Sequence, residues 1–257
     1  MDLNYKSIGQ GYPVVILHGL FGTLDNWQWV AKHLAQHHSV FSVDQRNHGR
    51  SPHLPDISYP ILAEDLKEFM EHHWMYKANI IGHSMGGKTA MQFALDFPEM
   101  VNKLMVIDIA PKKYHGGHEI IFNALQSIDL QSTNQRSDVE DHLQKFIDDK
   151  GTIQFLLKNL TRNEDASFQW KMNLDALVNH YQDILDDVSG HYETFEGPSL
   201  FVKGSKSKYI VDADWQNIVK RFPQAELCTI ADAGHWVHAD QPQQLVDVLI
   251  DFMKDSH

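Results

Sequence analysis

The segment Gly82-His83-Ser84-Met85-Gly86 has residue types that could perform nucleophilic chemistry. A serine with glycine two residues away on each side is typical of a sharp turn between a strand and a helix, with the hydroxyl exposed. Side chains larger than glycine would clash there with the neighbouring strands. The start of the following helix directs partial positive charge at the serine, which favours a developing anion. Ser84 is therefore our candidate nucleophile; the alternative is a glycine-rich helix start without chemistry.

Short apolar segments would position this serine. Each is rich in β-branched or large apolar residues and is bounded by glycine, proline or polar residues, which predicts buried strands. They are residues 14–17, 40–43, 79–81, 104–107, 200–202 and 227–230. Helical spacing predicts helices at residues 27–36, 61–74, 85–97, 212–222 and 241–253. This alternation predicts an α/β fold, with a mostly parallel central sheet and helices on both faces.

The alternation stops between residues 112 and 197. This stretch is polar and acidic, contains helical patterns at 120–128, 139–147 and 170–185, and has no pattern that predicts a strand. We interpret it as a helical cap insertion over the sheet edge. The expected domains are therefore a core of residues 1–111 and 198–257 and a cap of residues 112–197. The alternative is a run of ordinary surface helices.

Three further segments, in order, resemble motifs of the α/β-hydrolase superfamily. His18-Gly19-Leu20-Phe21-Gly22 is similar to its oxyanion loop, and Asp44-Gln45-Arg46-Asn47-His48-Gly49-Arg50-Ser51 is similar to its D-x-R-x-x-G-x-S turn. Asp232-Ala233-Gly234-His235-Trp236 is similar to the turn that carries the catalytic histidine. With the serine segment they cover residues 14 to 250 apart from the cap. The resemblance implies the α/β-hydrolase fold.

Two segments narrow the resemblance. Arg46-Asn47-His48-Gly49 and Asp108-Ile109-Ala110-Pro111 resemble the YbfF-type esterase branch, which is related to ABHD11-like hydrolases. The branch implies a serine hydrolase that cleaves small carboxylic esters, and also acyl-CoA thioesters, through an acyl-enzyme on Ser84. It needs no cofactor and no metal. The alternatives are a C–C bond hydrolase, a lyase or a cofactor-free haloperoxidase with the same serine, and a non-catalytic binding protein on this scaffold.

A serine hydroxyl needs a neighbouring base to take its proton and later return it. His235 follows the last predicted strand, where the family places this base. We interpret His18, His83 and His238 as structural. The oxyanion of the tetrahedral intermediate needs two backbone N–H donors. We expect Met85, which follows the nucleophile, and Leu20, which follows His18-Gly19, to supply them.

The acid is the position at which this sequence departs from the family pattern. The strand after the cap ends in Lys203-Gly204-Ser205-Lys206-Ser207, so serine occupies the position of the usual carboxylate. Asp108 ends the strand after the nucleophile helix, and an aspartate in an apolar run needs a partner. We therefore predict that Asp108 orients His235. Ser205 or Ser207 would support the triad by hydrogen bonding, and Asp212 and Asp214 are the alternative acids.

Charge and cysteine content exclude some classes. The formal net charge of −12 argues against binding nucleic acid or an anionic membrane. We see no secretory signal at the N-terminus and no apolar stretch long enough to span a membrane. Cys228 is the only cysteine, so an intramolecular disulfide is impossible, which fits a cytoplasmic location. The expected partner is a small-molecule substrate, and the sequence leaves the oligomeric state open.

Overall fold

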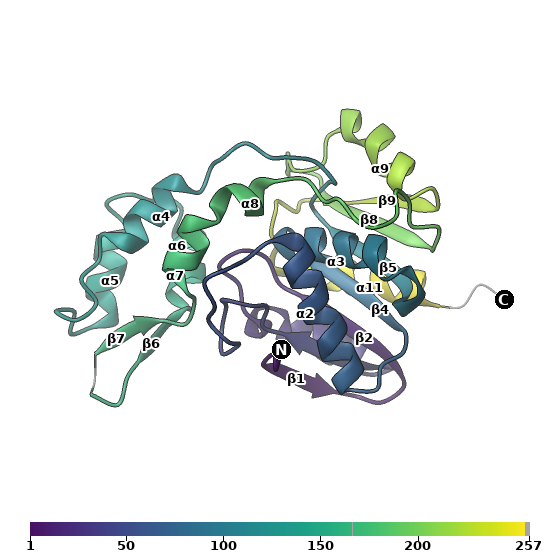
Figure 1. Ribbon diagram of the computed structural model, residues 1–257. Helices are drawn as coiled ribbons and strands as arrows, with labels where there is room; N and C mark the ends of the chain where they lie inside the picture. The colour runs from purple at the N-terminus through teal and green to yellow at the C-terminus, as the bar shows by residue number, and fades with distance from the viewer. Residues whose placement is uncertain (166, 255–257) are drawn as a thin grey trace.

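The computed structural model describes residues 1–165 and 167–254, and within them seven strands form one sheet (Figure 1). Their order is β1-β3-β2-β4-β5-β8-β9, in which β1 is antiparallel to β3 and the other neighbours are parallel. The strands are β1 (Tyr5–Ile8), β2 (Tyr12–Leu17), β3 (His38–Val43), β4 (Ala78–His83), β5 (Val101–Ile107), β8 (Ser199–Gly204) and β9 (Ala225–Ile230). The predicted α/β fold class is confirmed.

Helices cover both faces of this sheet. One face carries α2 (Tyr59–His72), α3 (Met85–Asp96) and α9 (Trp215–Arg221), and the other carries α1 (Gln28–Leu34), α10 (Val237–Asp240) and α11 (Pro242–Met253). Short 3₁₀ helices are η1 (Leu24–Trp27), η2 (Pro98–Met100) and η3 (Asp212–Asp214). Side chains alternate along each strand, so Val15 and Leu17 of β2 pack on one face while Val14 and Ile16 pack on the other. Both layers are therefore apolar.

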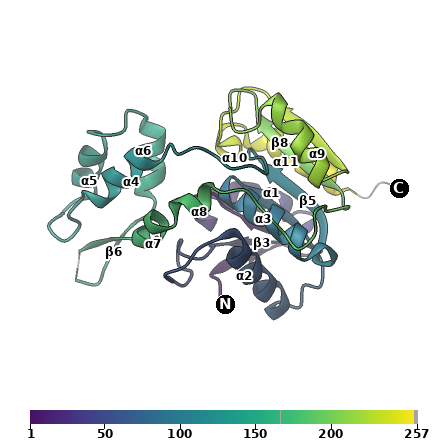
Figure 2. The same cartoon turned by 45° about the horizontal axis from the view of Figure 1, so that its top comes forward.

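Between β5 and β8 the chain leaves the sheet and builds a group of elements beside it (Figures 1 and 2). They are α4 (Glu119–Gln126), α5 (Arg136–Leu143), α6 (Lys150–Leu157), β6 (Leu160–Arg162), β7 (Phe168–Trp170), α7 (Leu174–Asn179) and α8 (Tyr181–Leu185). We call residues 112–197 the cap; its treatment as a separate domain stays a prediction. The expectation of no strand here is wrong, because β6 and β7 pair as an antiparallel hairpin.

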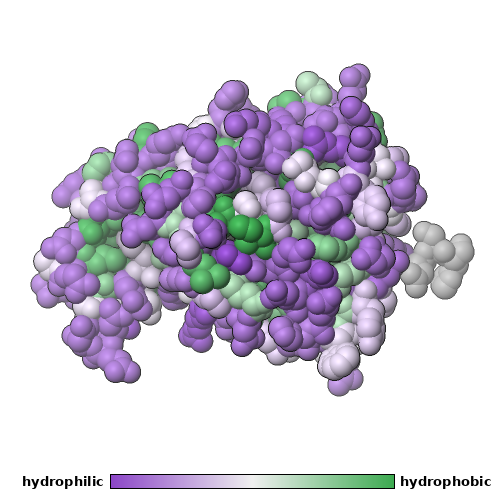
Figure 3. All heavy atoms as spheres, in the orientation of Figure 1, coloured by the Kyte–Doolittle hydropathy of each residue, from purple (hydrophilic) through white to green (hydrophobic). Residues whose placement is uncertain are grey.

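The cap packs on the sheet through apolar side chains. Phe122 and Leu125 of α4 and Leu156 of α6 are buried and belong to the same core as the helices α2 and α3. Hydrophilic residues cover most of the outer face in Figure 3, while hydrophobic atoms gather where the cap meets the sheet. No helix among the described residues is long and apolar enough to cross a lipid bilayer.

Candidate active site

Ser84 lies in a strained turn between β4 and α3. Its backbone φ of 52° is in the left-handed region, which is costly for a residue with a side chain. Its N–H donates to the carbonyl of Ile107 at 3.0 Å, which joins the turn to the end of β5. A Cβ on Gly82 would lie 2.1 Å from the carbonyl oxygen of Gly86, and one on Gly86 would lie 2.4 Å from that of Leu17. The two glycines are therefore required by backbone packing.

Ser84, His235 and Asp108 form one hydrogen-bonded chain. His235 Nε2 lies 3.0 Å from Ser84 Oγ, and His235 Nδ1 lies 2.8 Å from Asp108 Oδ2. A carboxylate accepts hydrogen bonds, so we assign the ring proton to Nδ1. Nε2 then carries the lone pair that accepts the serine hydroxyl. The structure thus brings together the three residues that the sequence singled out.

Asp108 is fully buried at the end of β5, and its charge is satisfied by donors. Besides His235, Oδ2 accepts a hydrogen bond from the hydroxyl of Ser207, and Oδ1 accepts one from the backbone N–H of Gly204 at 3.1 Å. Both donors come from the end of β8 and the loop after it. A buried carboxylate with several donors is held in one orientation.

Ser205, in contrast, lies away from the acid. It is exposed, and its hydroxyl accepts a hydrogen bond from the backbone N–H of Asp232 at 3.0 Å. Of the two serines expected to support the triad, the structure therefore brings Ser207 to Asp108 and places Ser205 in the loop contact instead.

The two alternative acids are engaged elsewhere. The exposed Asp212 lies 3.5 Å from the ammonium of Lys203. Asp214 accepts hydrogen bonds from Lys112 Nζ at 2.8 and 2.7 Å and from the backbone N–H of Val211 at 2.9 Å. Both stand in the first turn of η3, as their sequence context indicated. Neither is placed to orient His235.

Two aromatic neighbours hold His235. The ring of Tyr209 stacks on the imidazole with centroids 3.7 Å apart and planes 15° apart, which restricts its rotation. His83 Nε2 lies 2.8 Å from the backbone carbonyl of His235 and must donate to it. Burial, together with the nearby His235, lowers the pKa of His83 well below its usual value. His83 is therefore neutral and adds no charge beside the site.

The loop His18–Gly22 turns sharply next to Ser84. The carbonyl of Gly19 accepts hydrogen bonds from His18 Nδ1 at 2.8 Å and from the N–H of Gly22 at 2.9 Å. In a trans peptide the N–H points opposite to the C=O, so the Leu20 N–H points away from both donors. Leu20, Ser84 and Met85 line one small cavity beside the serine.

Met85 opens α3, so its N–H has no acceptor one turn earlier in the helix. The structure thus brings the two expected oxyanion donors, Leu20 and Met85, to the same side of Ser84 as this cavity. The partial positive charge of the helix start adds to the field that an anion would meet there.

Residues 12–242 match the model of the alpha/beta hydrolase fold family. The chain is an α/β hydrolase.

Individual relatives of this hydrolase are named as esterases and lipases. The sn-1-specific diacylglycerol lipase ABHD11 of Danio rerio is 38% identical over 97% of this chain and 81% of its own length. Esterase YbfF of Escherichia coli K12 is 35% identical over 95% and 93%. A solved structure described as a marine microorganism esterase is 43% identical, covers 98% of this chain and 99% of its own, and has a TM-score of 0.96. The hydrolase is therefore an enzyme of the carboxylesterase type, and the predicted family resemblance is confirmed.

A cavity of about 400 Å³ opens at Ser84 between the sheet and the cap of the hydrolase. Its lining is mostly apolar and combines core residues with residues of α4 and α6, among them Trp27, Ile121, Phe155, Leu156 and Trp236. Its polar wall carries Ser84 and His235. A cavity of this size with a mainly apolar surface and several polar side chains is typical of small-molecule sites.

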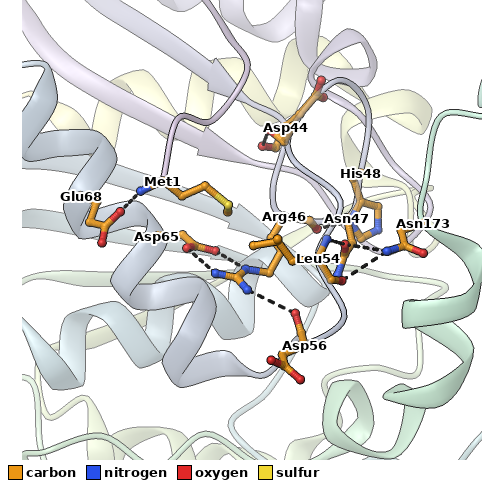
Figure 4. A network of polar contacts seen from close by, with 11 residues as sticks. Met1, Asp44, Arg46, Asn47, His48, Leu54, Asp56, Asp65, Glu68 and Asn173 are labelled. Atoms are coloured by element: carbon orange, nitrogen blue, oxygen red, sulfur yellow. Dashed lines mark hydrogen bonds and ion pairs between the residues drawn. The ribbon is translucent and has the colours of Figure 1, made fainter.

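The Asp44–Ser51 turn of the hydrolase is held by a network of polar contacts, part of which Figure 4 shows. Arg46 makes a bidentate ion pair with Asp65 at 2.7 and 2.8 Å. Asp44 accepts hydrogen bonds from the backbone N–H groups of Leu24 and Arg50 at 2.7 and 3.0 Å. These contacts give Asp44 and Arg46 a structural role in the turn.

Sequence reasoning missed Tyr209 and His118, two residues that line the cavity. Tyr209 lies in an irregular loop after β8, where no periodicity or motif marks a functional residue. His118, which precedes α4, also lines the cavity and contacts the hydroxyl of Tyr181 through Nδ1 at 2.8 Å. The polar composition of the cap gave no signal for these contacts, because they join segments that are distant in sequence.

Proposed function

We propose that Ser84, His235 and Asp108 are the catalytic triad of a carboxylesterase that works through an acyl-enzyme. The observation that carries this proposal is the continuous hydrogen-bonded chain from Asp108 through His235 to Ser84 Oγ, which ends at an apolar cavity. The chain order of nucleophile, acid and histidine is also the order typical of this fold. Ser207 is proposed to support Asp108.

The reaction would run in two halves. His235 Nε2 takes the proton of Ser84 as Oγ attacks the ester carbonyl, and then gives that proton to the departing alcohol oxygen. The acyl group remains on Ser84 as an ester. Water, deprotonated by His235, attacks this ester and releases the carboxylic acid, and Ser84 recovers its proton.

The charge that develops in each half has a defined place. The oxyanion of each tetrahedral intermediate would accept hydrogen bonds from the backbone N–H groups of Leu20 and Met85. One such donor is worth about 3–4 kcal/mol of barrier in a related type of site. The transient imidazolium of His235 is stabilised by Asp108, and the neutral His83 does not oppose it.

The cavity favours esters with an uncharged acyl group. Trp27, Ile121 and Phe155 offer apolar contact for the acyl chain, and the lining contains no lysine or arginine among the described residues. Fixed cations would be expected where the phosphates of coenzyme A bind. Relatives named as sn-1-specific diacylglycerol lipase and Esterase YbfF support an oxygen ester as substrate. Acyl-CoA thioesters stay a prediction of second rank.

A fluorophosphonate probe combined with an ester series tests the proposal. The wild-type protein is expected to be labelled by the probe. It should hydrolyse p-nitrophenyl acetate, butyrate, octanoate and palmitate, with kcat/KM highest for the acyl length that the cavity accommodates. Ser84→Ala should lose both labelling and hydrolysis, by at least about 10⁴-fold, while its thermal unfolding stays cooperative. Folded wild-type protein that is neither labelled nor active on any ester would contradict the proposed function.

A further inference from the structure

The cap contacts the oxyanion loop at Phe21. The side-chain amide nitrogen of Asn159, which lies between α6 and β6, donates to the carbonyl oxygen of Phe21 at 2.6 Å. The ring of Phe21 also packs edge-to-face against Phe122 of α4, with centroids 5.0 Å apart. Phe21 is thus held by the cap through both its backbone and its ring, although Asn159 is 138 residues away in sequence.

Asn159 is itself rigidly placed. Its side chain is 1% exposed, and its backbone N–H donates to the carbonyl of Leu156 at 2.9 Å. Its backbone carbonyl accepts from the N–H of Lys171 at 2.7 Å, beside β7. Both backbone groups of Asn159 are paired and its amide is enclosed. The side chain is therefore already ordered in the free enzyme, and no entropy is lost when the N–H donates to Phe21 during the reaction.

Phe21 needs such a contact because of its backbone conformation. Its φ is 59°, in the left-handed region that residues with a Cβ rarely adopt. It occupies the third position of the turn closed by the hydrogen bond from the Gly22 N–H to the Gly19 carbonyl. Because the same turn orients the peptide between Gly19 and Leu20, a relaxation at Phe21 would rotate the Leu20 N–H.

We infer that Asn159 is a positioning residue: through its hydrogen bond to the Phe21 carbonyl, the cap holds the oxyanion loop in the shape that directs the Leu20 N–H at the reacting carbonyl. The inference rests on the proposed function, which assigns Leu20 as an oxyanion donor. By this inference the cap affects the rate of the chemical step, in addition to lining the cavity. Asn159 stabilises the transition state through the loop and touches no substrate.

The matched control is a second asparagine of the cap that also bonds to the core. Asn173 donates from its backbone N–H to the carbonyl of Asn47 at 2.9 Å, and from Nδ2 to the Asn47 side chain and the Leu54 carbonyl at 3.1 and 3.2 Å (Figure 4). These contacts join the cap to the Asp44–Ser51 turn rather than to the oxyanion loop. Removing the Asn173 side chain therefore loosens the cap without touching Phe21.

The test compares Asn159→Ala, Asn159→Leu and Asn173→Ala on one p-nitrophenyl ester and with a boronic acid, whose adduct with Ser84 places an oxygen in the oxyanion position. Both Asn159 variants are expected to lower kcat about 10-fold and to leave KM within about twofold of the wild-type value. Their affinity for the boronic acid should also fall about 10-fold. Asn173→Ala should change each quantity by less than about twofold. Asn159→Leu keeps a side chain of similar size, removes the donor and adds no charge, so it serves if Asn159→Ala does not fold.

The outcomes separate this inference from the proposed function. If the wild-type enzyme shows no esterase activity, the proposed function fails. If the wild-type enzyme is active and Asn159→Ala and Asn173→Ala lose kcat equally, Asn159 only attaches the cap and the inference is wrong. The inference is also wrong if a folded Asn159 variant retains wild-type kcat and wild-type affinity for the boronic acid.

Discussion

Backbone strain is found at the ends of the strands that carry the site residues. Ser84 and Asp108 have φ values of 52° and 54°, so each adopts the left-handed conformation directly after its strand. Such conformations persist only when surrounding contacts over-determine them. Here Ser84 is tied to the Ile107 carbonyl, and the Asp108 N–H donates to the Val202 carbonyl at 2.7 Å. The two side chains are thereby directed toward His235 by main-chain hydrogen bonds.

Replacement of the acid gives the first prediction at this scale. Asp108→Asn removes the acceptor that fixes the His235 tautomer, and we expect kcat to fall about 10⁴-fold, as for the corresponding change in a serine protease. Asp212→Asn is the control, because Asp212 is exposed and contacts only Lys203 among the described residues. Steady-state kinetics on one ester measure both. Wild-type kcat in Asp108→Asn with a loss in Asp212→Asn would reverse our assignment of the acid.

Ser207 and Ser205 offer a matched pair for a second prediction. Ser207→Ala removes one donor to Asp108 Oδ2, so the carboxylate is less well held and kcat should fall about 10-fold. Ser205→Ala removes only the contact to the Asp232 N–H and should leave kcat within about twofold. Equal effects of the two substitutions on kcat would argue against a role for Ser207 at the acid.

Site residues could be predicted from the sequence where they belong to a short local motif or stand out from their neighbours. Ser84 and His235 stand in short motifs beside predicted strands, and Asp108 was notable as a charge in an apolar run. Tyr209 and Asn159 left no such pattern, because their contacts depend on where an irregular loop and the cap fold back onto the core. Tertiary packing of distant segments cannot be derived from spacing along one chain.

At the scale of elements, α3 does more than present Ser84. Its polar residues Lys88, Gln92 and Asp96 are spaced four apart, lie on one face, and bond to the segment that returns from the cap. Lys88 Nζ donates to the carbonyls of Leu185 and Asp186 at 3.0 and 2.5 Å. Gln92 exchanges two hydrogen bonds with the backbone of Ser189, both at 3.0 Å. The nucleophile helix is thus also the attachment site of the cap.

Lys88 makes the stability of this attachment dependent on pH. Burial lowers the pKa of its ammonium from 10.5 to about 8. Between these values the unfolded chain binds more protons than the folded one, so the free energy of unfolding should rise as pH increases from about 8 toward 10. The contribution is on the order of 3 kcal/mol, from about 1.4 kcal/mol per pKa unit.

Urea unfolding of the wild type and Lys88→Met at pH values across this window measures the effect. As pH rises through this window, the free energy of unfolding of the wild type should increase relative to that of Lys88→Met. The buried Tyr59 and Tyr114 have raised pKa values, which lower the free energy of unfolding as pH rises further. Both proteins contain these tyrosines, so the comparison between the two proteins cancels their contribution. A difference that is constant with pH would show that the Lys88 ammonium is not destabilised by burial.

Element prediction from sequence succeeded where periodicity was long and failed where elements were short or exposed. The buried parallel strands and the helices α1, α2, α3 and α11 were recognised from apolar runs and helical spacing. The edge strand β1 was missed because all four of its residues are exposed. The hairpin of β6 and β7 was missed because each strand has three residues, too few for an alternating pattern.

At the scale of the whole molecule, the net charge of −12 should affect which substrates approach the cavity. An anionic substrate such as an acyl-CoA is repelled at low ionic strength, and salt screens that repulsion. We expect kcat/KM for a short acyl-CoA to rise several-fold from low to physiological ionic strength, and kcat/KM for a neutral p-nitrophenyl ester of the same acyl group to stay constant. A fall with salt for the acyl-CoA would reveal local cations that attract it.

The attachment of the cap between β5 and β8 has a consequence for how this enzyme can diversify. The two strands are parallel neighbours in the sheet, so the cap belongs to the crossover connection that runs from the carboxyl end of β5 to the amino end of β8. A segment inserted there can be lengthened, shortened or exchanged without breaking a strand pair. Recombination with a relative would therefore transplant a cap as a single module. From the role proposed for Asn159, a chimaera whose incoming module lacks a donor to the carbonyl of Phe21 is expected to fold but to have a kcat about 10-fold lower.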